Sequence, residues 1–134
     1  MGTFDITSFE KALNSLKEVI EVYNSDKTNL IVRDSMIQRF EYTYSIALKM
    51  IKRFFSQGAF VLENIEAMTF NEMIRQANKM ELLKSNLEKW DNFRQKRKLT
   101  SHTYDEDVAR DVASIIEDFA IEVAYLLNRL KEKI

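Results

Sequence analysis

Residues 104–134, YDEDVARDVASIIEDFAIEVAYLLNRLKEKI, decide the fold, because their apolar residues recur at every third or fourth position. The stripe consists of Val108, Val112, Ile115, Phe119, Val123, Leu126, Leu130 and Ile134. An apolar stripe of this kind must be buried against other elements. We therefore predict one unbroken helix from about Tyr104 to the C-terminus, packed on a helical core.

The preceding sequence predicts four more helices, over residues 8–23, 29–57, 70–83 and 86–97. A capping box, in which Ser or Thr is followed three residues later by Glu, marks helix starts. It occurs at Thr7/Glu10, Thr69/Glu72, Ser85/Glu88 and Thr103/Glu106. Gly58 suits the end of the second helix, and the aperiodic apolar residues 59–68 predict a connector lying on the core. Five helices with short connections predict an all-α, up-and-down five-helix bundle in one domain, residues 1–134.

The composition limits the possible functions. The chain has 134 residues, no proline, two glycines and no cysteine, which favours long helices and excludes disulfides and thiolate metal sites. With one histidine, a His-based zinc site is not expected, and we predict no metal and no cofactor. No apolar run approaches a bilayer span and no signal sequence is evident, so we predict a cytoplasmic protein without membrane contact. A net charge of −1 means that any nucleic-acid affinity must come from a local basic patch.

The candidate site is the stretch at residues 97–104, RKLTSHTY, which contains the only histidine. Arg97, His102 and Tyr104 supply a fixed cation, a group that titrates near neutrality and a hydroxyl. These groups can bind a phosphate ester and move protons around it. Arg94, Lys96 and Lys98 add positive charge and are the predicted phosphate or nucleic-acid contacts.

In a continuous helix, residues five apart point about 140° from one another, so Arg97 and His102 could not serve one site there. The helix-breaking Thr and Ser residues at 100–103 predict that the chain breaks and returns His102 towards Arg97. With Thr103 as the N-cap, His102 would lie beside a helix start that favours an anion.

A plainer interpretation stands beside this one and is favoured by spacing alone. A basic run at a helix C-terminus commonly compensates the helix dipole, and a lone histidine before a helix is commonly an exposed or packing residue. Trp90 is a core residue on this interpretation, although an aromatic near arginines can also stack a base.

The Arg97-x4-His102-x-Tyr104 string between two helices resembles the HEPN domain family. Residues 37–41, IQRFE, and Trp90 ahead of the motif resemble its branch of nucleotidyltransferase substrate-binding proteins. These are small helical proteins encoded beside a minimal nucleotidyltransferase. Lys98 departs from the pattern, because the family typically has asparagine or another short polar residue there.

The resemblance implies a metal-independent ribonuclease that is the toxin of a toxin–antitoxin pair, with Arg97 and His102 as catalytic residues. It also implies that the partner nucleotidyltransferase modifies Tyr104 with AMP. In-line cleavage needs both a base and an acid, so the single histidine favours a homodimer that brings two copies together. Apolar residues off the main stripe of the second helix predict burial on two sides and also favour that dimer; they are Met36, Leu48, Met50 and Phe55.

Two alternatives stay open. In one, the chain is a non-catalytic substrate-binding or docking subunit of the nucleotidyltransferase, and the basic turn holds a nucleotide or an RNA phosphate. In the other, it is a structural helical-bundle interaction protein and the basic turn is incidental.

Overall fold

The computed structural model describes residues 4–57 and 65–134, which form helices joined by turns. The elements in chain order are α1 (Thr7–Ser25), α2 (Leu30–Ser56), η1 (Ile65–Ala67), α3 (Phe70–Lys79), α4 (Leu87–Lys98), η2 (Leu99–His102), α5 (Glu106–Ala113) and α6 (Ile116–Lys133), where η denotes a 3-10 helix. The predicted all-α bundle is confirmed, with its fifth helix divided into α5 and α6. The predicted helix end at Gly58 and residues 59–64 of the predicted connector lie outside the described residues.

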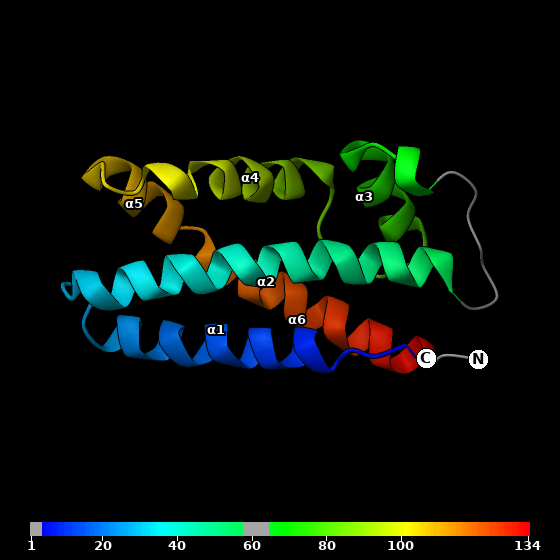
Figure 1. Cartoon of the computed structure of the whole chain (residues 1–134), viewed down its shortest axis with the longest axis horizontal. Helices are drawn as coiled ribbons and strands as arrows, with labels where there is room; N and C mark the ends of the chain where they lie inside the picture. The colour runs from blue at the N-terminus through cyan, green and yellow to red at the C-terminus, as the bar shows by residue number, and fades with distance from the viewer. Residues whose placement is uncertain (1–3, 58–64) are drawn as a thin grey trace.

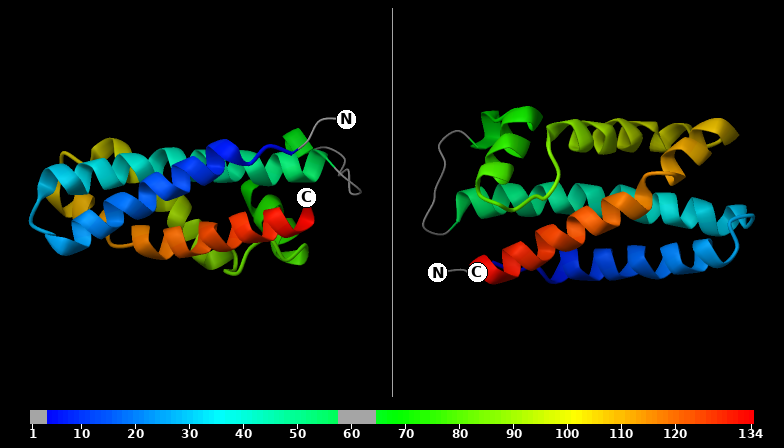
Figure 2. Two further views of the ribbon diagram at one scale, coloured as in Figure 1. Left: turned by 90° about the horizontal axis from the view of Figure 1, so that it is seen from below. Right: turned by 180° about the vertical axis from the view of Figure 1, so that it is seen from behind.

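Helix α2 is the central element of the bundle. It runs beside α1 on one side, while α3 and α4 lie along its other side (Figure 1). Helix α6 crosses behind these helices at an angle, as the rear view in Figure 2 shows. Because α2 has neighbours on several sides, three of the four residues off its main stripe, Met36, Met50 and Phe55, are at most 2% exposed, whereas Leu48 is half-buried. The predicted burial on two sides is therefore confirmed, but it occurs within one chain and so gives no support to a homodimer.

Aromatic rings from three helices form the centre of the core. Phe119 of α6 meets Phe40 of α2 edge-to-face with ring centroids 4.9 Å apart, and meets Phe93 of α4 at 5.3 Å. Trp90 is fully buried and packs edge-to-face on Phe93 at 5.4 Å. Such pairs add to the stabilisation from burial itself. The prediction that Trp90 belongs to the core is confirmed.

The Glu122 cluster, which consists of Ser85, Trp90 and Glu122, ties α4 to α6. Glu122 is 2% exposed and accepts hydrogen bonds from the Ser85 backbone N–H (3.0 Å), the Ser85 hydroxyl (2.7 Å) and the Trp90 indole N–H (2.9 Å). A buried carboxylate with three donors is well satisfied.

Only one of the four predicted capping boxes forms, at Thr69/Glu72. At α1 the N-cap is Ile6, which makes no side-chain cap. At α4 the cap is Asn86, because Glu122 already engages Ser85. The predicted boxes at Thr7/Glu10, Ser85/Glu88 and Thr103/Glu106 were therefore wrong.

The predicted unbroken last helix was also wrong, because the chain leaves the helical path at Ser114 and Ile115. The Ser114 hydroxyl donates to the Asp111 carbonyl at 2.6 Å, a local bond that competes with helix continuation. Val112 and Ile116 are fully buried on either side of the break, so the apolar stripe continues while the helix axis changes direction. Similarly, α3 ends at Lys79 instead of residue 83, because Glu81 adopts a left-handed conformation with φ of 60°.

Candidate functional site

The motif arginine lies in the last turn of α4, and the chain continues from it directly into η2. The Arg97 Nη1 donates to the Thr100 hydroxyl at 3.2 Å, and that hydroxyl donates to Glu41 Oε2 of α2 at 2.7 Å. Arg97 Nη1 also lies 3.8 Å from Glu41 Oε2. Thr100, which is buried, thus fixes the guanidinium against α2.

The predicted break between the fourth helix and the last one is confirmed, since α4 ends at Lys98 and α5 begins at Glu106, but a 3-10 turn lies between them. Residues 98 and 99 keep right-handed helical angles, and the tighter 3-10 turn carries the chain through His102. His102 and Tyr104 are both exposed, with ring centroids 6.4 Å apart in an edge-to-face arrangement. Tyr104 is 88% exposed, so its phenol is open to solvent.

The helix after the motif does not begin at the predicted N-cap. Asp105 is the N-cap of α5, and its Oδ1 accepts from the backbone N–H groups of Asp107 (3.0 Å) and Val108 (3.4 Å). Glu106 and Asp107 add negative charge in the first turn. The prediction of Thr103 as the N-cap was therefore wrong, and the chain's own carboxylates compensate the helix dipole.

Glu106 also anchors the motif turn to α2. The buried Arg33 guanidinium forms an ion pair with Glu106 and another with Asp34 at 3.2 Å. The hydrogen bond from Arg33 holds the pKa of Glu106 below its usual range. Arg33 therefore fixes the start of α5, two residues after Tyr104.

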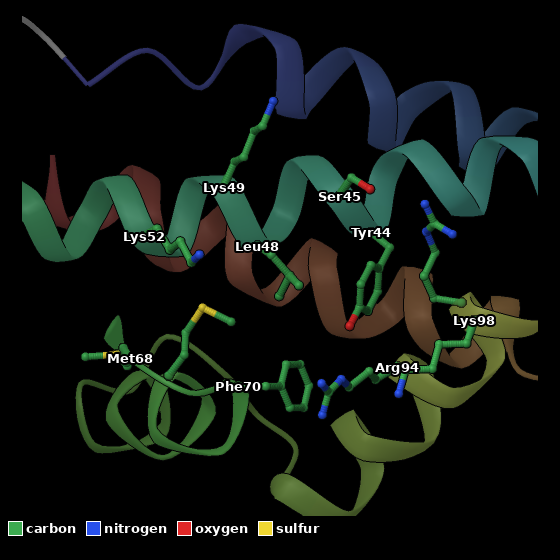
Figure 3. A pocket seen from close by; sticks show the side chains of 11 residues that line it. Tyr44, Ser45, Leu48, Lys49, Lys52, Met68, Phe70, Arg94 and Lys98 are labelled. Atoms are coloured by element: carbon green, nitrogen blue, oxygen red, sulfur yellow. The ribbon is translucent and has the colours of Figure 1, made fainter. Parts of the chain in front are cut away.

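Arg97 is one of the residues that line a hollow of about 450 Å³ between α2, α3 and α4, which we call the basic groove. Figure 3 shows this groove from close by. Its lining residues are Tyr44, Ser45, Leu48, Lys49, Lys52, Met68, Phe70, Met73, Arg94, Arg97 and Lys98. Among the described residues, this lining includes five cations and no carboxylate.

The basic groove contains three of the six predicted site residues, Arg94, Arg97 and Lys98. His102 and Tyr104 do not line it. Lys96 does not line it either, because it points to α5 and forms an ion pair with Asp111 at 3.0 Å. In a single chain, the motif histidine therefore lies outside the groove that the motif arginine lines.

The sequence analysis missed the part of the groove supplied by α2 and α3. Ser45, Lys49 and Lys52 follow one face of α2 at helical spacing, which is the signal that could have marked them. Phe70 stacks under the Arg94 guanidinium, whose carbon lies 4.7 Å from the ring centroid. Burial raises the pKa of Tyr44 to about 12, against the opposing charges of Arg94 and Arg97, so its hydroxyl stays protonated near neutrality.

Within residues 4–57 and 65–134, no group of three or more His, Asp or Glu side chains could hold a metal ion. No helix in these ranges is both long and apolar enough to cross a membrane.

A helical bundle that presents an Arg-x4-His turn defines a class of protein, the HEPN-type domains. Residues 4–132 match the family described as nucleotidyltransferase substrate binding protein like, and the chain belongs to this family, as the resemblance predicted.

Two relatives come from Haemophilus influenzae. A protein named probable ribonuclease HepT is 38% identical over 107 residues, which cover 77% of this chain and 73% of that protein. A solved structure, described as revealing the fold of a substrate binding domain of a nucleotidyltransferase, is 32% identical with a TM-score of 0.85, covering 95% of this chain and 99% of that one. A crystal structure from Thermus thermophilus is 30% identical with a TM-score of 0.70, covering 91% of this chain and 98% of that one.

Proposed function

We propose that this chain is the partner subunit of a minimal nucleotidyltransferase and acts as a metal-independent ribonuclease, the toxin of a toxin–antitoxin pair. The observation that carries the proposal is the placement of the motif: Arg97 is fixed beside the basic groove, and the exposed His102 follows it on the same turn. The relative named probable ribonuclease supports the activity, and the family description supports the partner.

The chemistry follows from the residue types. One His102 removes the proton of the ribose 2′-hydroxyl, whose oxygen then attacks the adjacent phosphorus. The bond from phosphorus to the 5′ oxygen breaks, a second His102 in its protonated form donates a proton to that oxygen, and a 2′,3′-cyclic phosphate remains. Arg97 stabilises the negative charge that accumulates on the phosphorane.

Two histidines require two chains, because each chain has one. We therefore propose a homodimer whose two-fold axis lies near residues 97–104, as in the closed dimers that dominate soluble oligomers. Sedimentation equilibrium at micromolar protein should give twice the chain mass of 15.9 kDa. A monomer at all concentrations would rule out the composite site.

Regulation by the partner would act on Tyr104. The proposed step transfers AMP from ATP to the phenolic oxygen, with release of pyrophosphate and of the phenolic proton. The 88% exposure of Tyr104 supports its access to a modifying enzyme, and an adenylate two residues from His102 would obstruct the RNA.

A second candidate function is the non-catalytic binding subunit, and the basic groove favours it, because phosphate binding there does not require His102. Purified protein incubated with RNA and EDTA separates the two functions. His102→Ala should abolish cleavage and leave the fold intact, whereas Tyr104→Phe should keep cleavage and lose modification by the nucleotidyltransferase and ATP. If the wild type never cuts RNA, the ribonuclease proposal fails and the binding subunit is what remains.

A further inference from the structure

We infer that the basic groove is a subsite for one nucleotide unit, which holds a phosphate among its cations and an unpaired base at its apolar end. The inference deepens the proposed function, on which it rests for the use of Arg97, by naming the substrate class as a single-stranded nucleoside phosphate.

The first argument is charge. Lys49, Lys52, Arg94, Arg97 and Lys98 line one hollow, and among the described residues only Arg97 has a carboxylate within 4 Å, that of Glu41 at 3.8 Å. Cations gathered in one hollow repel each other and raise the local positive potential, which attracts an anionic ligand. Outside the groove, α4 has lysines that are paired with carboxylates, since Lys96 forms an ion pair with Asp111 and Lys89 with Asp118.

The second argument is the apolar part of the groove. Leu48, Met68, Phe70 and Met73 provide an apolar and aromatic wall beside the cations. Inorganic phosphate gains nothing from such a wall, whereas a nucleobase has a flat face that stacks on aromatic rings and guanidinium groups. The Arg94–Phe70 pair offers both types of surface at one position (Figure 3).

The third argument is Tyr44, whose ring packs in the aromatic core and whose residue is 6% exposed. Figure 3 shows its hydroxyl pointing into the groove, on the side of Arg94. A hydroxyl that points into the groove can donate a hydrogen bond to an acceptor on a ligand there.

Size selects a single unpaired unit. A hollow of about 450 Å³ falls within the usual range for small ligands. A base in the middle of a duplex has its faces stacked on neighbouring bases and its edge paired, so it could not stack on the apolar wall of the groove. Single-stranded RNA and a free nucleotide share the required chemistry.

The test uses the full chain with His102→Ala, so that RNA stays intact while binding is measured by calorimetry. AMP, adenosine and inorganic phosphate are compared at low salt. AMP should bind at least about tenfold more tightly than either fragment, because it uses both ends of the groove. Equal binding of AMP and inorganic phosphate would overturn the inference.

Groove variants in the same background locate the site. Lys52→Ala should weaken AMP binding about tenfold, as for the loss of a charge-assisted contact. Phe70→Leu should weaken AMP binding about fivefold or more and leave inorganic phosphate unchanged. Tyr44→Phe, which keeps the packed ring, should also weaken AMP binding. Lys17→Ala on α1 is the matched control, and a loss equal to that of Lys52→Ala would show non-specific charge attraction and overturn the inference.

The remaining measurements identify the source of the nucleotide and separate this inference from the ribonuclease. A pentanucleotide that binds more tightly than AMP, with a steeper salt dependence, indicates RNA, and equal affinity indicates a free nucleotide; either supports the subsite. With His102 intact, Lys52→Ala and Phe70→Leu should raise KM for RNA and leave kcat nearly unchanged. If these variants cleave RNA with an unchanged KM, the subsite inference is overturned and the ribonuclease proposal stands. If the protein binds AMP but the wild type never cleaves RNA, the ribonuclease proposal fails and the subsite inference stands.

Discussion

The Glu122 cluster and the basic groove both include residues of α4, but they differ in how their charges are compensated. In the Glu122 cluster, one buried carboxylate accepts three hydrogen bonds from Ser85 and Trp90. Five cationic residues line the basic groove, and the nearest described carboxylate to any of them is Glu41, 3.8 Å from Arg97.

The comparison distinguishes charges that hold the fold from charges that are available to a ligand. A buried charge is tolerated when its hydrogen bonds are complete, and breaking such an arrangement is costly. Uncompensated cations at a surface contribute repulsion to the folded state, and their removal costs little stability. The following substitutions test this division, beginning with the largest expected effect.

Trp90→Ala should reduce the free energy of unfolding by about 3–5 kcal/mol, because it empties the centre of the aromatic core and removes a donor to Glu122. Urea unfolding followed by circular dichroism measures the loss. Tyr104→Ala removes an aromatic ring that is 88% exposed and should change stability by less than about 0.5 kcal/mol. Equal losses for the two variants would contradict the assignment of Trp90 to a stabilising cluster.

Glu122→Gln should cost about 1–3 kcal/mol, because the new amide nitrogen is a donor that faces other donors. The volume hardly changes, so the loss reports the hydrogen bonds and not a cavity. Glu21→Gln, at an exposed position of α1, is the control and should be neutral. A neutral Glu122→Gln would mean that the cluster does not depend on its charge.

The sequence was sufficient for the fold because apolar periodicity fixes which face of each helix is buried. Of the eight residues in the predicted stripe, the core contains five: Val112, Phe119, Val123, Leu126 and Leu130. Val108 and Ile115 are half-buried, and Ile134 is 56% exposed, so the prediction was wrong for Ile134. Periodicity does not fix the direction of the helix axis, so the break at Ser114 between α5 and α6 was missed. Local capping patterns failed where a distant residue competed, as Glu122 does for Ser85.

For the candidate site, the sequence identified the residues that lie close together in the chain, on α4. Arg94, Arg97 and Lys98 lie close together on α4, and helical spacing brings them to one groove. Lys49 and Lys52 come from α2, far earlier in the chain, and only the packing of α2 against α4 places them opposite. The separation of His102 from the groove of Arg97 also required the structure, because the 3-10 turn replaces the expected chain reversal.

The ion pair of Arg33 with Glu106 is intermediate between the buried Glu122 cluster and the open basic groove, since the Arg33 side chain is 4% exposed and that of Glu106 is 49% exposed. The pKa of Glu106 is lowered in the folded state, so the pair stabilises the protein above the usual glutamate pKa of 4.5 and loses this contribution as pH falls through the lower, folded-state value. Glu106→Gln should therefore be less stable than the wild type near neutral pH, and the two should converge in acid. Urea unfolding across the pH range measures the difference, and a constant difference would contradict the assigned role of the pair.

The smallest expected effect belongs to the basic groove. Lys49→Ala with Lys52→Ala should change the free energy of unfolding by no more than about 0.5 kcal/mol, with the sign favouring the variant, because the substitutions relieve repulsion and remove no described ion pair. The gain should shrink in high salt, where surface charges are screened. Lys11→Ala with Lys17→Ala, two exposed positions on α1, removes the same net charge away from the groove and is the matched control. A clear destabilisation of the groove variant alone would mean that its lysines hold the fold together, and the contrast with the Glu122 cluster would then disappear.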